Sequence, residues 1–183
     1  MRDTRREVLH FWFEEIEPRQ WFEVNPAFDK QVRDRFQVIY NMACEGLCNA
    51  WQEDADGAVA LCIVLDQFPR NMFRDTARAY ESDDTALLTA KYAVSRGYNH
   101  ILPPVRRKFL YMPYMHSESL SDQNKCVDLF EAMKNDDPVS HDYAVKHMKV
   151  IEQFGRFPHR NSVLGRAGTP EEAAFLAEQG PGF

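Results

Sequence analysis

The sequence predicts an all-α fold, arranged as a single domain of about eight helices. Apolar residues recur at helical spacing along nearly the whole chain, and the alternating pattern of a β-strand is almost absent. Residues that start and stop helices divide this pattern into segments of ordinary helix length. The 183 residues fit one domain with a sizeable core, and no linker or low-complexity segment interrupts them.

The predicted helices follow one another through short connections, which favours antiparallel hairpins of neighbouring helices. Their expected ranges are residues 4–15, 26–46, 57–67, 82–97, 103–114, 119–134, 140–154 and 169–179. The domain is expected to span residues 1–183. Residues 179–183 should form a loose tail, because the ending "EQGPGF" has no apolar pattern to anchor it.

Particular residues mark the ends of several helices. Asn25 and Thr169 each precede a proline, so each is expected to cap a helix whose first residue is that proline. Glu172 follows Thr169 by three residues, which is the spacing of a capping box. Three glycines are suited to the left-handed residue that ends a helix: Gly46, Gly97 and Gly155.

The composition is that of an ordinary globular protein and excludes several functions. A net charge of −6 without a basic block argues against nucleic-acid binding. The N-terminal apolar run is too short for a signal peptide or a membrane span, so no membrane association is expected. The four cysteines form no C-x-x-C pair, and no second ligand pair completes a zinc site with Cys44 and Cys48. We expect a cytoplasmic protein without a cofactor.

Two stretches of similar sequence contain most of the polar residues that indicate a functional site. They are "LDQFPRNMFR" (65–74) and "EQFGRFPHRN" (152–161), and each has Phe-Pro followed by arginine and asparagine. Pro69 disfavours helical backbone at Phe68, so the helix over 57–67 should stop there and a new short helix should begin. Pro158 should do the same. The cations that follow each proline would then lie at the positive end of a helix dipole, which requires a negative group nearby.

That negative group could belong to the protein itself. Four acids are candidates to neutralise the arginines of the two stretches: Asp66, Glu118, Asp122 and Glu152. Arginine suits this role because its planar fork pairs bidentately with a carboxylate. The two stretches would then act as polar staples, by which we mean ion pairs that tie helices together.

The negative group could instead be a bound ligand. Helix N-termini bind phosphate or carboxylate, and arginine, asparagine and histidine add further donors. If the two stretches face each other across an internal pseudo-symmetry, they form one polar cleft. The ligand-binding candidates are Arg70, Asn71, Arg74, Arg156, Arg160 and Asn161.

Whether such a cleft is catalytic is left open by the sequence. The candidate catalytic residues are His116, His159, Glu118 and Asp122. His116 or His159 would act as acid and base, because an imidazole titrates near neutral pH. A metal held by the same four residues is not expected, since their spacing is loose and no H-E-x-x-H pattern occurs.

His147 lies on one helix face with Tyr143, Ile151 and Phe154. A core histidine that is held by a backbone or tyrosine partner is the preferred interpretation. No P-loop, G-x-G-x-x-G or G-x-S-x-G motif is present, and Cys126 has no evident histidine base.

Several longer motifs also resemble a known family. "VLHFWFEE", "LDQFPRNMFR", "FLYMPYMHSESLSDQ" and "FGRFPHRNSVLGRAGTPEE" together resemble the bacterial domain-of-unknown-function 924 family, over Val8 to about Leu176. The resemblance implies a helical stack of the tetratricopeptide-repeat-like superfamily and implies no established activity. The 34-residue repeat signature of that superfamily is absent from this chain.

The sequence thus supports two hypotheses about function. In the first, which we prefer, a polar cleft of arginine, histidine, asparagine and acidic side chains binds a small anionic metabolite, and an enzyme would also transform it. In the second, the protein is an interaction module for a peptide or protein, and the polar cluster is a structural staple.

Overall fold

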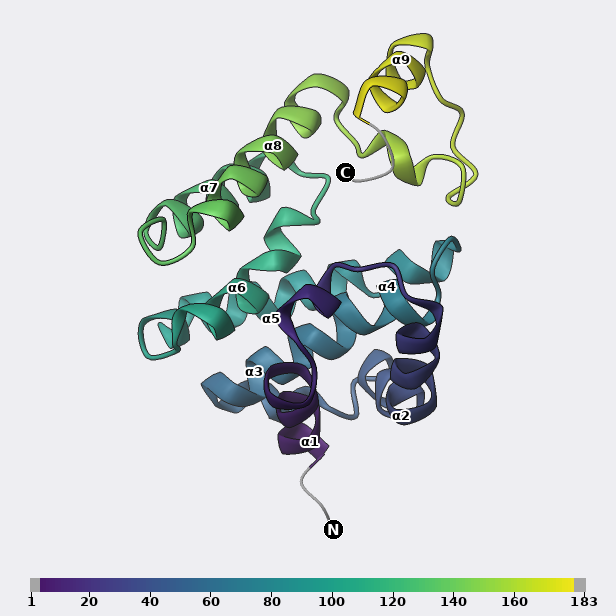
Figure 1. The fold of residues 1–183 in the computed structure, drawn as a ribbon. Helices are drawn as coiled ribbons and strands as arrows, with labels where there is room; N and C mark the ends of the chain where they lie inside the picture. The colour runs from purple at the N-terminus through teal and green to yellow at the C-terminus, as the bar shows by residue number, and fades with distance from the viewer. Residues whose placement is uncertain (1–3, 180–183) are drawn as a thin grey trace. The chain divides into compact units, whose positions relative to one another are not determined.

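The computed structural model describes residues 4–179, and helices form most of this part of the chain (Figure 1). No β-strand occurs between residues 4 and 179, so the predicted all-α fold is confirmed. Over the same residues, no helix has the length and apolar character needed to cross a membrane. The tail predicted at 179–183 lies outside the described residues, apart from Gln179, which ends the last helix.

The chain divides into two compact units. The first contains residues up to Arg74 together with Arg78–Pro113, and the second contains Asp75–Ala77 and the residues from Tyr114 onward. The division falls within helix α6 (Pro104–Met115), next to the proline inside that helix. The arrangement of the whole chain as a single domain stays a prediction.

In the first unit, helices pack around an aromatic core. Its helices are α1 (Thr4–His10), α2 (Pro26–Cys44), α3 (Ala55–Cys62), α4 (Phe68–Met72), α5 (Asp83–Ser95) and the first part of α6. Helix α2 packs against α4, and α3 packs against α1 and α5. The rings of Phe36 and Phe68 stack with their centroids 4.6 Å apart, and Phe11 lies 4.9 Å from Phe36. Asn25 caps α2 as predicted, since its side chain accepts hydrogen bonds from the N–H groups of Ala27 and Phe28.

The predicted break at Phe68 is wrong, although the expected short helix with Pro69 in its first turn is present as α4. Helix α3 widens into a π-helical segment, η4 (Ile63–Gln67), and continues as α4 with helical backbone angles at Phe68. A proline within an α-helix removes one hydrogen bond and crowds the carbonyl four residues earlier, which here is Leu65. The wider turn relieves the crowding, and the hydroxyl of Ser82 donates to the Leu65 carbonyl oxygen at 2.6 Å. The backbone therefore passes through Pro69 without an unsatisfied acceptor at Leu65.

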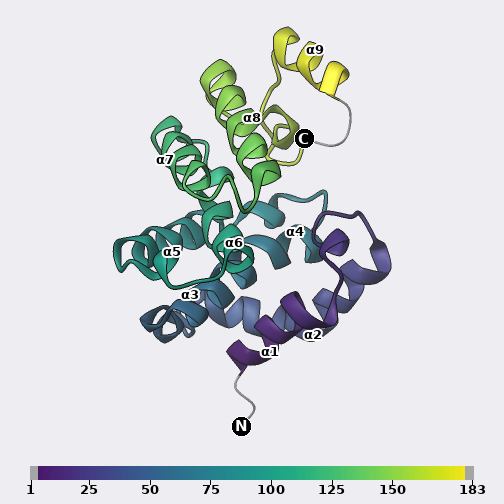
Figure 2. The same cartoon turned by 60° about the vertical axis from the view of Figure 1, so that its left-hand side comes forward.

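In the second unit, α7 (Leu120–Glu131) and α8 (Pro138–Phe154) form an antiparallel hairpin, which both ribbon views show (Figures 1 and 2). Gly155 ends α8 with φ of 67°, the left-handed conformation expected of it. A short 3₁₀ turn, η7 (Pro158–Arg160), then leads to α9 (Pro170–Gln179). The predicted capping box at the start of α9 is confirmed, because Thr169 and Glu172 exchange hydrogen bonds.

Candidate functional site

The first stretch contains a buried ion-pair network in the first unit. Arg70 forms two hydrogen bonds to the carboxylate of Asp83, at 2.8 and 3.0 Å, and lies 3.3 Å from a carboxylate oxygen of Asp66. Asp66 is 1% exposed and also accepts a hydrogen bond from the side chain of Gln67. Burial by itself would lower the pKa of Arg70, but the charges of Asp66 and Asp83 raise it above its ordinary value. The predicted partnership of Asp66 with an arginine of this stretch is therefore present.

The other polar residues of this stretch contact α2. Arg74 binds Asp29 through two hydrogen bonds of 2.8 Å each, and the side-chain amide of Asn71 donates to the same carboxylate at 2.9 Å. Because the helix is continuous, these cations do not lie at a helix N-terminus as expected. Two predicted ligand-binding residues, Arg74 and Asn71, thus tie α4 to α2.

In the second stretch, Arg156 and Asn161 converge on one buried carboxylate. Glu172 is 3% exposed and accepts from Arg156 at 2.7 and 2.9 Å, from Asn161 at 3.1 Å and from the N–H of Thr169 at 2.7 Å. The hydrogen bond from Arg156 is the main cause that lowers the pKa of Glu172 to about 2. These contacts tie α9 to the end of α8, whereas Glu152, the acid expected here, is exposed.

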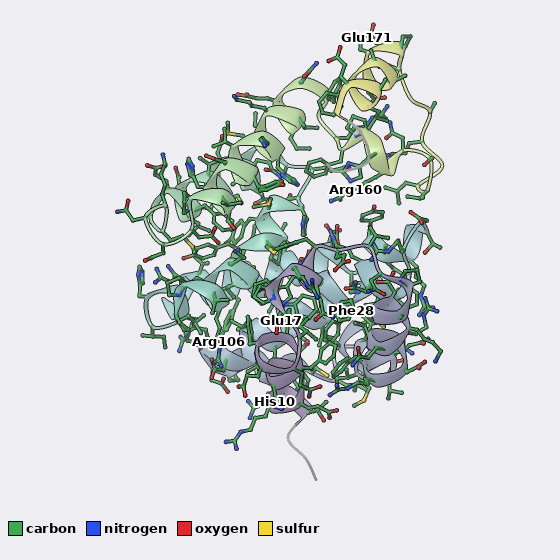
Figure 3. All side chains as sticks on the ribbon, viewed as in Figure 1. His10, Glu17, Phe28, Arg106, Arg160 and Glu171 are labelled. Atoms are coloured by element: carbon green, nitrogen blue, oxygen red, sulfur yellow. The ribbon has the colours of Figure 1, made fainter. Side chains whose placement is uncertain are left out.

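His159 and Arg160 of the second stretch lie beside the ring of Phe157, which is fully buried. The guanidinium carbon of Arg160 lies 4.5 Å from the centroid of this ring. The ring centroids of His147 and His159 lie 5.5 and 5.6 Å from it, and His116 lies 6.4 Å from His147. We call these five residues the Phe157 cluster. Arg160, which is 6% exposed, lies on the turn between α8 and α9 (Figure 3).

His147 contributes a neutral imidazole to the Phe157 cluster. Its Nδ1 atom lies 2.8 Å from the carbonyl oxygen of Tyr143, which confirms the backbone partner expected for this histidine. A carbonyl oxygen can only accept, so Nδ1 carries the proton and the neutral ring has its lone pair on Nε2. Burial, followed by the charges at His116 and His159, lowers the pKa of His147 to about 3. The sequence pattern predicts a core position for this residue and does not indicate that it lies beside the candidate site.

Two acids that were candidate catalytic residues have protein partners in the second unit. Glu118 pairs with Arg166 at 2.7 and 3.0 Å and accepts from the N–H of Phe157 at 2.8 Å. Burial raises the pKa of Glu118, but the hydrogen bonds from Arg166 and Phe157 outweigh it and lower the pKa overall. Asp122 accepts a hydrogen bond from Ser117 at 2.9 Å. Arg166 belongs to the segment "VLGRAG", outside the two stretches, so the sequence pattern did not single it out.

Neither a metal site nor, beside α9, a hollow suited to an anion is found among the described residues. Among the described residues, no group of three or more histidine, cysteine, aspartate or glutamate side chains is placed to hold a metal ion. A hollow of about 430 Å³ lies beside the first turn of α9, and its lining residues are Gln153, Phe154, Arg156, Thr169, Glu171 and Glu172. Arg156 is bound to Glu172 there, and two acids line the wall, so this hollow does not suit an anion.

Arginines of both stretches therefore pair with carboxylates of their own units. The convergence of the two stretches on one cleft stays a prediction. His116, His159 and Arg160 are brought together around Phe157, with His147 beside them. Arg70, Asn71 and Arg74 belong to the network of the first unit.

Comparisons with known proteins agree with the fold. The chain matches the family model described as "Bacterial protein of unknown function (DUF924)" over residues 8–180. It is similar to the solved structure of a protein of unknown function, ATU0120, from Agrobacterium tumefaciens, with 36% sequence identity and a TM-score of 0.90. That similarity covers 96% of this chain and 97% of the other. No curated protein matches the sequence. The chain belongs to the DUF924 family of bacterial proteins.

Proposed function

We propose that the protein binds a small anionic metabolite at the Phe157 cluster of the second unit. The observation that carries the proposal is the guanidinium of Arg160 held 4.5 Å from the Phe157 ring, with imidazoles around the same ring. A guanidinium stacked on an aromatic face keeps its N–H donors at the edge of its own plane, where a carboxylate or phosphate binds bidentately. Half-buried His116 and His159 add ring-nitrogen hydrogen-bonding groups beside the same guanidinium.

The other arginines of the two stretches support the staple interpretation. Arg70, Arg74 and Arg156 each form two hydrogen bonds to a carboxylate of the same unit. The staple interpretation and the ligand interpretation of these stretches then apply to different arginines. The staples hold the helices, and the Phe157 cluster binds the ligand.

A reaction at this site would use His116 or His159 for proton transfer. His147 suits a different task, because a pKa of about 3 makes it a weak base at neutral pH. Its role is that of a hydrogen-bond acceptor. We also place the protein in the cytoplasm, a location supported by free thiols at Cys44, Cys48, Cys62 and Cys126.

The interaction-module alternative calls for an exposed apolar groove. The exposed large apolar side chains are instead dispersed over several elements, as at Phe22, Val38, Leu88, Ile101 and Val139. Dispersed apolar residues of this kind are ordinary on the surface of a globular protein. We therefore prefer the ligand-binding hypothesis.

A thermal-shift assay with phosphate, sulfate and small carboxylates tests the proposal. A ligand at a hundred times its dissociation constant stabilises the protein by about 2.7 kcal/mol, which the assay resolves. Arg160→Met keeps the volume of the side-chain stem and removes the charge, so it should abolish the shift. Arg156→Met is the matched staple variant: it should lower the melting temperature and keep the shift. Arg19→Met, at an exposed arginine of the first unit, should change neither. A parent protein that shows no shift with any anion, or an Arg160→Met variant that keeps it, would contradict the proposal.

A further inference from the structure

We infer that Glu118 and Arg166 are positioning residues, which hold the Phe157 turn so that Arg160 and His159 face the ligand. The inference rests on the proposed function, because it assigns these two residues to the same anion site. It also changes the role of Glu118, which the sequence made a candidate catalytic residue.

Glu118 and Arg166 form hydrogen bonds with the two peptide groups that flank Phe157. On the N-terminal side, the N–H of Phe157 donates to Oε1 of Glu118 at 2.8 Å. On the C-terminal side, Nη2 of Arg166 donates to the carbonyl oxygen of Phe157 at 3.2 Å. Glu118 and Arg166 are joined by two hydrogen bonds of 2.7 and 3.0 Å, which closes the ring of contacts. One bidentate ion pair thus fixes the backbone on both sides of the buried phenylalanine.

Backbone hydrogen bonds also connect the residues that follow Phe157 to this ion pair. The N–H of Arg160 donates to the Phe157 carbonyl oxygen, and the N–H of Leu164 donates to the Arg160 carbonyl oxygen. The N–H of Arg166 donates to the carbonyl oxygen of Asn161 at 2.8 Å. Residues 157–166 therefore form a closed turn, and Glu118, from the connection between α6 and α7, ties it to the rest of the unit. A shift of the Phe157 peptide would move the ring on which Arg160 stacks.

Glu118 has an electrostatic effect that opposes its positioning effect. Its carboxylate lies close enough to Arg160 and Arg166 for both charges to lower its pKa. The negative charge weakens the local attraction for an anion, so electrostatics alone predicts that Glu118→Gln binds anions more tightly. Positioning predicts the reverse, since the glutamine loses the bidentate pair with Arg166. The sign of the change in affinity separates the two effects.

The test compares sulfate and phosphate binding by the parent protein, by Glu118→Gln and by a double variant, Glu118→Gln with Arg166→Met. The double variant removes one charge of each sign, so the net charge around Arg160 is unchanged. We expect both variants to bind these anions about tenfold more weakly, the loss typical when a group that orients a ligating residue is removed. Unchanged or tighter binding in both variants would overturn the inference.

A spectroscopic measurement keeps the inference testable even if the parent protein binds neither anion. The side-chain protons of Arg160 lie over the Phe157 ring, so ring currents should shift their NMR signals upfield. Both variants should move these signals toward the values of an exposed arginine. Signals that stay shifted would overturn the positioning role, whereas absence of anion binding by the parent protein contradicts only the proposed function. Glu118→Gln retains an acceptor for the Phe157 N–H and serves as the milder variant if the double variant unfolds.

Discussion

The guanidinium of Arg160 lies 4.5 Å from the centroid of the Phe157 ring, and Phe157 is fully buried. This contact gives the second Phe-Pro stretch a different character from the first. In the first stretch, Arg70 is bound by the carboxylates of Asp66 and Asp83. The two similar stretches therefore produce a staple at Arg70 in the first unit, and both a staple at Arg156 and a stacked arginine at Arg160 in the second.

The network around Arg70 should contribute strongly to the stability of the first unit. Asp66→Asn is expected to lower the free energy of unfolding by about 1.5–3 kcal/mol, the range for hydrogen bonds to charged groups, because Asp83 still pairs with Arg70. Replacing both acids by asparagine leaves the partly buried guanidinium of Arg70 without a carboxylate, so the loss should exceed that of the single substitution and stay below the roughly 3–5 kcal/mol of a fully buried pair. Urea denaturation measures both values. Asp56→Asn, at an exposed ion pair with Arg106, is the control and should cost about 0–1 kcal/mol.

The passage of the helix through Pro69 depends on Ser82. Ser82→Ala leaves the buried carbonyl oxygen of Leu65 without a donor and should lower the free energy of unfolding by about 1–3 kcal/mol. In a Pro69→Ala background, the new N–H at position 69 can donate to Leu65, so the same substitution should cost less. A double-mutant cycle in urea measures this coupling. Equal costs in the two backgrounds would refute it, and Ser95→Ala, at an exposed serine bonded to a backbone carbonyl, gives the control.

These two predictions show what the sequence could and could not specify. The Asn25 cap and the Thr169–Glu172 capping box depend on neighbouring residues, and local patterns predicted them correctly. Most helix ends were predicted to within a few residues for the same reason. Pro69 locally predicts a helix break, but the backbone stays helical there. The distant residue Ser82 donates a hydrogen bond to the Leu65 carbonyl oxygen, which the proline cannot do.

The ion-pair partners were predicted less well for the same reason. Arg74 pairs with Asp29, which lies 45 residues earlier, and Glu118 pairs with Arg166, 48 residues later. Only the packing of helices brings such residues together. Asp66 and Glu152 were both candidates because each precedes the proline of its stretch. Asp66 lies beside Arg70, one helical turn later, whereas Glu152 is exposed.

The stability of the second unit should fall as pH decreases through the range set by His147. The folded state lowers the pKa of His147 from 6.5 to about 3, so it favours the neutral ring. Between these values the unfolded chain binds the additional proton. The stabilising contribution is complete above pH 6.5 and is lost as pH falls toward about 3. Urea denaturation across this range should show the loss, and His147→Gln should flatten it. NMR of the imidazole should show a neutral ring with the proton on Nδ1 throughout the upper part of this range. A ring that becomes charged near its ordinary pKa would contradict the prediction.

Glu172 should make the free energy of unfolding of the second unit depend on pH in a second, more acidic range. Hydrogen bonds from Arg156 lower its pKa from 4.5 to about 2, so the folded state favours the carboxylate. The stability that this provides is present above pH 4.5 and is lost as pH falls toward about 2. Glu172→Gln should remove this part of the pH dependence in denaturation measured over the same range. Glu152→Gln, at an exposed glutamate of the same unit, should leave it intact, and an equal effect of both substitutions would argue against the staple.

The most direct test of the account is an NMR titration that follows the side-chain N–H signals of the arginines while phosphate is added. The proposed anion site predicts that the Arg160 signal moves and saturates, while the signal of Arg156, which is bound to Glu172, stays in place. Replacing His159 by glutamine should weaken the response without moving the Arg156 signal. A titration in which Arg160 does not respond, or in which all exposed cations respond equally and without saturation, would contradict the assignment of the Phe157 cluster as a ligand site.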